Sequence, residues 1–252
     1  MVTRSEVIIK MANRRCIALI YQFALNISLI KDYEQIAVLE SMVSDERKKR
    51  IDRYRFDKDK VRCLIAEMLL RYALYMQYGI DSSKISFRYK ENGKPFLTDS
   101  NIRFNLSHSG EWVVCALGNS EIGIDVEEIK AIDFRSVYQR FSGSEIQLLD
   151  NIKTERQSDP FYRMWTLKES YVKYNGLGLR CPFESFSINF DENEKSSLMK
   201  NGNYDNTISL ISSKVDENHW YAVCTEISEK ISEIKIVTVS DLIYALFGQM
   251  QQ

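Results

Sequence analysis

Histidine and cysteine, the residues from which soft-metal sites and disulfide frameworks are built, are sparse in this sequence. The 252 residues include two histidines, His108 and His219, and five cysteines. The cysteines are scattered, odd in number and form no C-x-x-C pair, which excludes a disulfide framework and a typical zinc site. We therefore expect reduced, mostly buried cysteines. A metal site in this chain would use carboxylate oxygens, which favour a hard cation such as Mg²⁺.

An excess of either charge is also absent. The chain carries 34 Lys and Arg against 35 Asp and Glu, which gives a net charge of -1 at pH 7. This balance creates no global field that would attract a polyanion or an anionic lipid surface. We therefore expect neither a nucleic-acid partner nor a membrane partner, and we expect any anion site to be local.

Long hydrophobic runs are missing as well. One apolar run follows the Arg-Arg pair at 14–15 and has the outline of a secretion signal, but Gln22, Asn26 and Ser28 interrupt it. It is too short to span a bilayer as a helix, and no clear cleavage site follows it. The β-branched and aromatic content of residues 16–23 favours a buried strand. We therefore predict a cytoplasmic protein, with the secretion signal as the alternative.

The pattern of elements indicates an α+β fold, because 44% apolar and 12% aromatic residues supply a core and the same order of elements occurs twice. We predict two similar lobes related by a pseudo-twofold axis, residues 1–120 and 121–252. Each is expected to pack an antiparallel sheet on helices, with the active site in the cleft between them. The predicted helices and strands occupy these ranges: a helix pair within 33–77, strands at 84–89, 103–106 and 112–117, a strand at 122–126, helices within 133–150 and 161–175, and strands at 184–190, 207–213, 219–225 and 234–239.

Two carboxylates in the segment GIDVE, residues 123–127, have the spacing of a shared metal site. Asp125 and Glu127 stand at positions i and i+2 of a predicted strand, so both side chains project from one face. Ile124 and Val126 then face the other way. Two carboxylates on one face can share a cation, although an ordinary strand with a polar outer face is the alternative.

The segment 161–175 reads as an amphipathic helix with charged residues at two kinds of position. Glu169 and Lys173 stand one helical turn apart and can meet, although a simple surface ion pair is the alternative. Lys168 falls within the apolar stripe of the helix. Its ammonium must therefore either extend outward along its neighbours or meet an anion, and an anionic ligand in the cleft would explain it.

The segment FNLSHSG, residues 104–110, leaves a strand and turns at Gly110. It places His108 between two serines, and we interpret it as a donor cluster for phosphate oxygens. A packed histidine is the alternative. The basic run at 46–62 and the Gly-Lys-Pro turn at 93–95 would supply cations to a ligand with several phosphates. The usual explanation of such a run, a solvated helix face, is the alternative.

Together these motifs resemble the 4'-phosphopantetheinyl transferase superfamily, in its two-lobed Sfp type. The resemblance rests on GKP at 93–95, FNLSHSG at 104–110, GIDVE at 123–127, WTLKESYVK at 165–173 and GLGL at 176–179, and it extends from about residue 47 to 190. It implies a monomeric enzyme that binds coenzyme A in the cleft. Such an enzyme transfers the phosphopantetheine arm to a serine of an acyl or peptidyl carrier protein and releases 3',5'-ADP.

The resemblance also implies roles for residues of this sequence. The metal ligands, for Mg²⁺ or alternatively Mn²⁺, are Asp125, Glu127 and Glu169. The residues with catalytic roles are Glu169, as general base directly or through a water, Lys173 and His108. The contacts to coenzyme A are Lys49, Arg62, Lys94, Pro95, Ser107, His108, Lys168 and Lys173. The contact to the 3'-phosphate can come from Arg47, Lys48 or Lys49, and we choose Lys49.

Two other functional classes remain as alternatives at this stage. Acidic clusters with a lysine also cleave phosphate esters, so a metal-dependent phosphodiesterase is the first. A non-catalytic module that binds coenzyme A or a carrier protein is the second, although such a module does not require all three carboxylates. The identity of the carrier and of its pathway, whether non-ribosomal peptide, polyketide or fatty acid synthesis, stays open.

Overall fold

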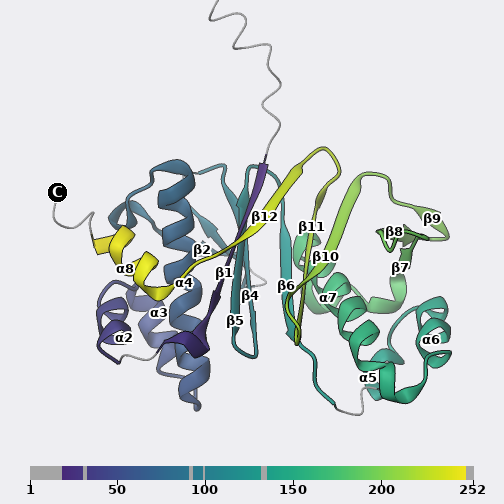
Figure 1. Cartoon of the computed structure of the whole chain (residues 1–252). Helices are drawn as coiled ribbons and strands as arrows, with labels where there is room; N and C mark the ends of the chain where they lie inside the picture. The colour runs from purple at the N-terminus through teal and green to yellow at the C-terminus, as the bar shows by residue number, and fades with distance from the viewer. Residues whose placement is uncertain (1–18, 31–32, 91–92, 99, 132–134, 248–252) are drawn as a thin grey trace, which may run out of the picture.

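Two β-sheets lie next to one another in the middle of the molecule, and helices cover their outer sides (Figure 1). This computed structural model describes residues 19–30, 33–90, 93–98, 100–131 and 135–247. The predicted α+β class is confirmed. In the described part of the chain, no helix is both long enough and apolar enough to cross a membrane.

The first sheet has the strand order β12-β1-β5-β4. Its strands are β1 (Leu19–Asn26), β4 (Arg103–Ser109), β5 (Trp112–Gly118) and β12 (Lys230–Ile236). The pairs β1–β5 and β4–β5 are antiparallel as predicted, whereas β1–β12 is parallel. The apolar run that outlined a secretion signal is therefore largely a buried strand, and the predicted residues before Leu19 lie outside the described part of the chain.

One face of this sheet packs on α4 (Asp57–Tyr78), which begins after Phe56 and ends at Gly79 in the left-handed conformation. The expected helix pair within 33–77 consists of three helices, because α2 (Tyr33–Glu40) and α3 (Asp45–Ile51) precede α4. The break is specified by Ser44, whose side chain accepts a hydrogen bond from the Arg47 N–H and so caps α3.

The second sheet has the order β10-β11-β6 and packs on a long helix, α7. The bounds are β6 (Gly123–Glu128), β10 (Ile208–Asp216), β11 (His219–Glu226) and α7 (Ser158–Asn175). Ile124 and Val126 of β6 are fully buried between the two sheets, as the alternation of that strand predicted. The remaining elements are β2 (Phe87–Tyr89), β3 (Pro95–Leu97), α5 (Arg135–Tyr138), α6 (Gly143–Asp150), β7 (Ser187–Phe190), β8 (Ser196–Lys200), β9 (Asn203–Tyr204) and α8 (Val239–Phe247).

The last strand and helix of the chain return to the first sheet. β12 pairs with the edge of β1, and α8 packs on α4 (Figure 1). The prediction that residues 121–252 form one lobe is therefore wrong for this segment, whose pairing covers an otherwise open strand edge. The connections β5–β6 and β11–β12 are joined where Ser120 Oγ donates to Glu229 Oε1 at 2.7 Å. A boundary near residue 120 and a pseudo-twofold axis stay predictions.

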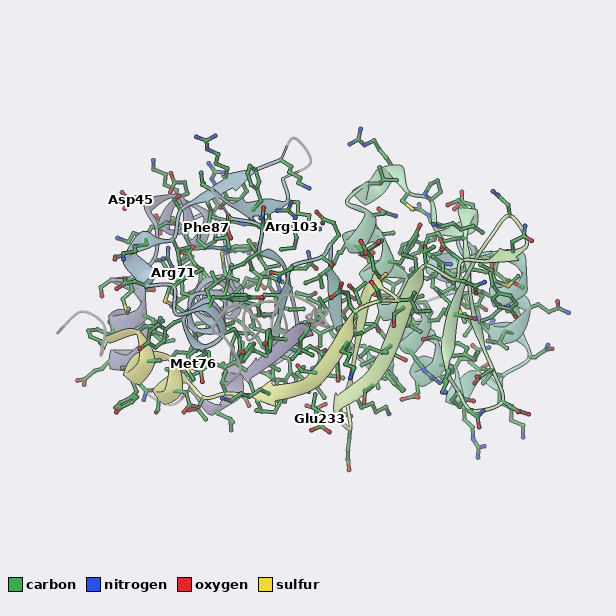
Figure 2. The ribbon with its side chains drawn as sticks, turned by 90° about the horizontal axis from the view of Figure 1, so that it is seen from above. Asp45, Arg71, Met76, Phe87, Arg103 and Glu233 are labelled. Atoms are coloured by element: carbon green, nitrogen blue, oxygen red, sulfur yellow. The ribbon has the colours of Figure 1, made fainter. Side chains whose placement is uncertain are left out.

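Buried charges and sulfur complete the core. Within the described residues, Cys63, Cys115, Cys181 and Cys224 are free thiols, and all but Cys181 are buried, as expected. Arg71 and Phe87 are labelled near one another in Figure 2, and the Arg71 guanidinium lies 5.5 Å from the Phe87 ring centre.

Candidate functional site

The two sheets meet along β4 and β6, and side chains rather than backbone hydrogen bonds join these strands. Three alternate residues of β4 point across the junction, as the two-residue period of a strand requires. Their hydrogen bonds are Ile124 N–H to Asn105 Oδ1 at 2.9 Å, Ser107 Oγ to Asp125 Oδ1 at 2.8 Å, Ser109 Oγ to Glu127 Oε2 at 2.8 Å and Glu128 N–H to Ser109 Oγ at 3.2 Å. The segment predicted to bind phosphate and the strand predicted to bind a metal are thus neighbours.

Gly123 brings β6 unusually close to α7. A Cβ atom at this position would stand 1.8 Å from the Ser170 carbonyl oxygen and 2.4 Å from the Tyr174 nitrogen. No side chain fits between this strand and this helix, so glycine is required for their close approach. The approach carries Asp125 on the strand to within reach of Lys173 on the helix.

A cavity of about 370 Å³ lies at this junction. Its lining comes from β4, β6 and α7 and comprises Leu106, Ser107, His108, Asp125, Glu127, Trp165, Glu169 and Lys173. The structure therefore brings together the three predicted metal ligands and three of the predicted phosphate contacts, which were assigned from separate segments of the sequence.

Asp125 and Lys173 form the closest ion pair in the cavity. The Lys173 ammonium lies 2.5 Å from Asp125 Oδ1 and 2.8 Å from Ser107 Oγ. Asp125 is 2% exposed, and its second oxygen, Oδ2, is buried without a hydrogen-bond partner among the described residues. Burial raises the pKa of Asp125, while Lys173 and Ser107 act to lower it. A buried carboxylate oxygen without a donor is a ready ligand for a cation.

Glu127 and Glu169 complete the acidic cluster. Burial, followed by the charge of Asp125, raises the pKa of Glu127 to about 7, against hydrogen bonds from Ser109 and Trp165. Burial and Asp125 likewise raise the pKa of Glu169, and Lys173 opposes them. Asp125 raises the pKa of both glutamates, and one lysine faces all three carboxyl groups. The cluster therefore favours an additional cation.

The donor set suits a hard divalent cation, since all three groups are carboxylates and one oxygen is unsatisfied. Among the residues that the structure describes, however, no three His, Cys, Asp or Glu side chains already converge as a metal site. The Lys173 ammonium contacts Asp125 Oδ1 instead.

His108 and Arg62 form the adjoining side of the site. His108 is exposed toward the cavity, so it is not the packed histidine of the alternative interpretation. Loss of solvent around its ring and then the charges of Arg62 and Lys173 lower its pKa. Arg62 Nε is buried and has no hydrogen-bond partner in the described chain, while its Nη2 lies 3.5 Å from Asp59. Arg62 and Lys173 thus place two positive charges near the His108 ring.

Lys94 and Pro95 lie on the other side of α7's last turn. The Lys94 ammonium donates to the Lys173 carbonyl oxygen at 2.9 Å and pairs with Glu121 at 3.3 Å. Both residues line a separate cavity of about 510 Å³ with Arg103, which is labelled in Figure 2. Burial lowers the pKa of Lys94, and Glu121 opposes this effect. Lys94 thus contacts the helix that carries Lys173, but it does not line the carboxylate cavity.

Lys168 does not belong to the site, so that prediction is wrong. Its side chain is completely buried, and its ammonium donates to both oxygens of Glu145, at 2.7 and 2.9 Å, and to the Phe186 carbonyl oxygen at 2.9 Å. It also lies 4.1 Å from the centre of the Phe186 ring. The anion that pairs with this buried lysine is therefore Glu145 of α6, and not a ligand in the cleft.

The three candidates for the 3'-phosphate contact differ in structure. Arg47 is buried and bonds Glu67 at 3.0 Å, so it serves the core. Lys48 lies 3.7 Å from Asp45 on the surface of α3. Lys49 is exposed on the same helix, and its choice stays a prediction.

Sequence reasoning missed Trp165 and Ser109 as site residues. Trp165 lines the cavity and hydrogen-bonds to Glu127. Its position, one helical turn before Glu169, was the available signal. Ser109 stands two residues after Ser107 on β4, so the same period that relates Asp125 to Glu127 relates the two serines.

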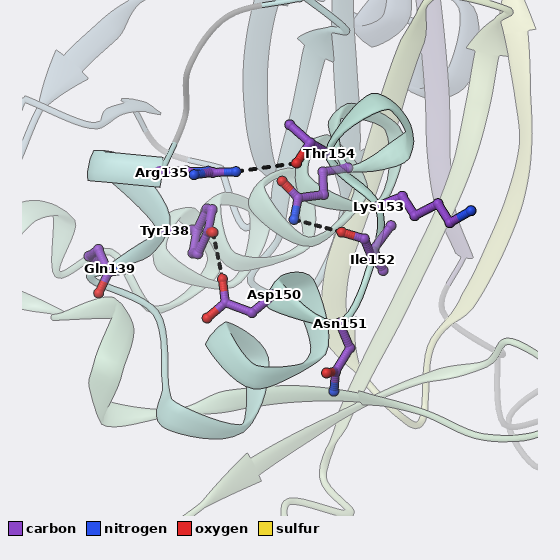
Figure 3. Close-up of a pocket in the computed structure, with 9 residues that line it drawn as sticks. Arg135, Tyr138, Gln139, Asp150, Asn151, Ile152, Lys153 and Thr154 are labelled. Atoms are coloured by element: carbon purple, nitrogen blue, oxygen red, sulfur yellow. Dashed lines mark hydrogen bonds between the residues drawn. The ribbon is translucent and has the colours of Figure 1, made fainter.

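Another cavity, of about 630 Å³, lies between α5, α6 and the start of α7 (Figure 3). Two hydrogen bonds join polar groups of its lining: Tyr138 donates to Asp150 at 2.7 Å, and Arg135 donates to Thr154 Oγ1 at 3.2 Å. It contains none of the predicted site residues. The carboxylate cavity therefore remains the candidate active site.

Comparisons with known proteins show the family of this chain. Residues 31–120 match the family model described as 4'-phosphopantetheinyl transferase, N-terminal, and residues 121–224 match the model of the 4'-phosphopantetheinyl transferase superfamily. The 4'-phosphopantetheinyl transferase psf-1 of Bacillus pumilus is 32% identical over 214 residues, which cover 84% of this chain and 91% of that protein. The Sfp protein of Bacillus subtilis (strain 168) is 32% identical over 204 residues, or 81% of this chain and 91% of that protein.

Two further matches have different coverage. The 4'-phosphopantetheinyl transferase gsp of Aneurinibacillus migulanus is 37% identical over 187 residues, which cover 74% of this chain and 78% of that protein. A crystal structure of a holo-(acyl-carrier-protein) synthase of Bacillus anthracis, in complex with CoA (3',5'-ADP), covers 42% of this chain and 95% of that chain, with 20% identity and a TM-score of 0.37. From the two family models and the relatives that match over most of their length, we conclude that this chain belongs to the 4'-phosphopantetheinyl transferase superfamily and is an enzyme of its Sfp type.

Proposed function

We propose that this enzyme transfers the 4'-phosphopantetheine arm of coenzyme A to a serine hydroxyl of an acyl or peptidyl carrier protein, with the help of a divalent cation. The observation that carries the proposal is the cavity in which Asp125, Glu127 and Glu169 lie with Ser107, His108 and Lys173. An acidic cluster beside phosphate-binding donors suits a reaction at a diphosphate.

Asp125, Glu127 and Glu169 would hold the cation, which we propose to be Mg²⁺, with Mn²⁺ as a substitute. The unsatisfied Asp125 Oδ2 is the first oxygen available to it. When bound, such a cation supplies positive charge that stabilises the negative charge developing on the oxygens around the transferred phosphorus.

The residues of the chain have separate tasks in the transfer. The serine oxygen of the carrier forms a bond to the β-phosphorus of coenzyme A, and the bond from that phosphorus to the bridging oxygen breaks. Glu169 accepts the serine proton, for which its raised pKa is suitable. The Lys173 ammonium neutralises the 3',5'-ADP that leaves. His108 and Arg62 hold phosphate oxygens at the nucleotide end. The two side chains lie close enough that the charge of Arg62 lowers the pKa of His108.

Mass spectrometry of apo-carrier proteins incubated with enzyme, coenzyme A and Mg²⁺ tests the proposal. We expect the carrier to gain the mass of the phosphopantetheine arm. Glu169→Gln is expected to keep the fold and lose at least about 100-fold in rate, as for removal of a general base. Asp125→Ala is expected to raise the Mg²⁺ concentration needed for half-maximal rate.

Glu217→Gln is the matched control, since Glu217 is exposed and does not line the cavity. Its transfer rate should equal that of the wild type. Cleavage of coenzyme A without modification of any carrier would favour the phosphodiesterase alternative. Near-normal transfer by both site variants would refute the assignment of the site.

A further inference from the structure

We propose that Lys173 and the divalent cation compete for Asp125, so that the enzyme takes up its cation together with the diphosphate of coenzyme A rather than before it. This inference rests on the proposed function and adds an order of binding to it. The substrate of the enzyme would accordingly be the cation–coenzyme A complex.

The first support is the geometry of the ion pair. Lys173 Nζ contacts both Asp125 Oδ1, at 2.5 Å, and Ser107 Oγ, at 2.8 Å, while Ser107 Oγ donates to the same carboxylate oxygen at 2.8 Å. The ammonium and the hydroxyl thus close a three-membered network around Oδ1. Oδ1 already accepts two hydrogen bonds, so a cation ligated by this oxygen must displace the ammonium or the Ser107 hydroxyl.

The second support is electrostatic. A cation that binds Asp125 Oδ2 instead stays on the same carboxylate as the ammonium, and the Asp125 side chain is only 3% exposed. Water screens charges weakly in such a place, so the two positive charges repel one another strongly. Binding at either oxygen is therefore opposed by Lys173 for as long as its ammonium remains at Asp125.

The third support is the freedom of Lys173 to leave. Its side chain is 27% exposed, and it lines the cavity together with His108 and Glu169. A diphosphate in this cavity offers anionic oxygens to the ammonium and, at the same time, to a cation on the carboxylates. Once its ammonium contacts the diphosphate, Lys173 no longer opposes the cation at Asp125 and helps to hold the ligand that the cation also contacts. Since coupling between two ligands is reciprocal, the cation and coenzyme A each raise the affinity for the other.

Titration with Mn²⁺, followed by electron paramagnetic resonance of the free ion, tests this coupling without any turnover. The proteins are the full-length wild type, Lys173→Met and Lys173→Gln, each with and without coenzyme A. Without coenzyme A, both variants are expected to bind Mn²⁺ about tenfold or more tightly than the wild type. With saturating coenzyme A this advantage should disappear, so the affinity gain caused by coenzyme A falls by at least about tenfold in the variants.

Lys195→Met is the matched control, because Lys195 is exposed and does not line the cavity. It should bind Mn²⁺ as the wild type does in both conditions. Lys173→Gln retains a hydrogen-bond donor toward Asp125, so it preserves the site if the methionine variant misfolds.

Two outcomes separate this inference from the proposed function. If the wild type modifies carriers but the Lys173 variants bind Mn²⁺ no more tightly without coenzyme A, competition at Asp125 is refuted and the proposed function stands. If the wild type neither binds Mn²⁺ with coenzyme A nor modifies any carrier, the proposed function fails and this inference fails with it.

Discussion

Substitution of Gly123 by alanine is expected to separate the two elements that form the active site. The added Cβ would meet the Ser170 carbonyl oxygen at 1.8 Å, whereas ordinary contact begins at 3.4 Å, so strand and helix must move apart by about 1.6 Å. The obstacle is backbone, which cannot rotate away as a side chain does. Overpacking of this kind costs about 1–3 kcal/mol, and we expect the upper end of that range.

The same displacement reaches the chemistry, because Asp125 lies two residues after Gly123 and Lys173 three residues after Ser170. Their 2.5 Å contact cannot survive a movement of this size. Misplacement of catalytic groups by about 1 Å can cost about 100-fold in rate. We therefore expect kcat/KM to fall by at least about 100-fold in Gly123→Ala.

Urea unfolding and carrier modification, measured on the same protein preparations, check both expectations. Gly143→Ala is the matched control, since a Cβ at this first position of α6 meets nothing within 4 Å. It should leave the rate unchanged and alter stability by no more than about 1 kcal/mol. A Gly123→Ala enzyme with wild-type stability and rate would refute the claim that close packing of β6 on α7 sets the site.

Three buried groups give further predictions. Burial alone would raise the pKa of Glu67, but Arg71, the Ser44 N–H and Arg47 lower it below its ordinary value of 4.5. The ionised Glu67 therefore contributes its full stabilisation above pH 4.5. That stabilisation is lost as the pH falls through the lowered pKa. Replacement of Glu67 by glutamine should therefore cost about 3–5 kcal/mol at pH 7, and urea midpoints should show the difference from wild type shrinking below pH 4.5. Lys168→Met should cost a similar amount, about 3–5 kcal/mol, because it strands the Glu145 carboxylate in the core. Adding Glu145→Gln should recover part of this loss, whereas additive costs in a double-mutant cycle would contradict the proposed pairing.

The site was predictable from sequence where local periodicity determines geometry. The two-residue period of a strand placed Asp125 and Glu127 on one face, and the helical period placed Glu169 one turn before Lys173. Both relations involve neighbours in the chain, so no knowledge of the fold was needed. The proximity of the two segments came from the family resemblance, since no periodicity relates residue 125 to residue 173.

The errors arose where a partner lies far away in sequence. Lys168 was assigned to the ligand because a helical wheel shows a buried lysine but not Glu145, 23 residues earlier. The parallel pairing of β12 with β1 joins the two ends of the chain, and nothing in either strand specifies it locally. Trp165 was not assigned to the site, because its hydrogen bond to Glu127 depends on a tertiary contact that the helical period does not show.

The bond between Ser120 and Glu229 lies where the chain passes from the first sheet to the second and back again. At the opposite end of β5, the Trp112 indole N–H donates to Asp216 Oδ2 of β10 at 2.6 Å. The two sheets are therefore tied to one another beyond both ends of this strand, and apolar side chains of both sheets share one buried cluster. The register of β4 against β6, and with it the spacing of the serines from the carboxylates, is held along the whole junction.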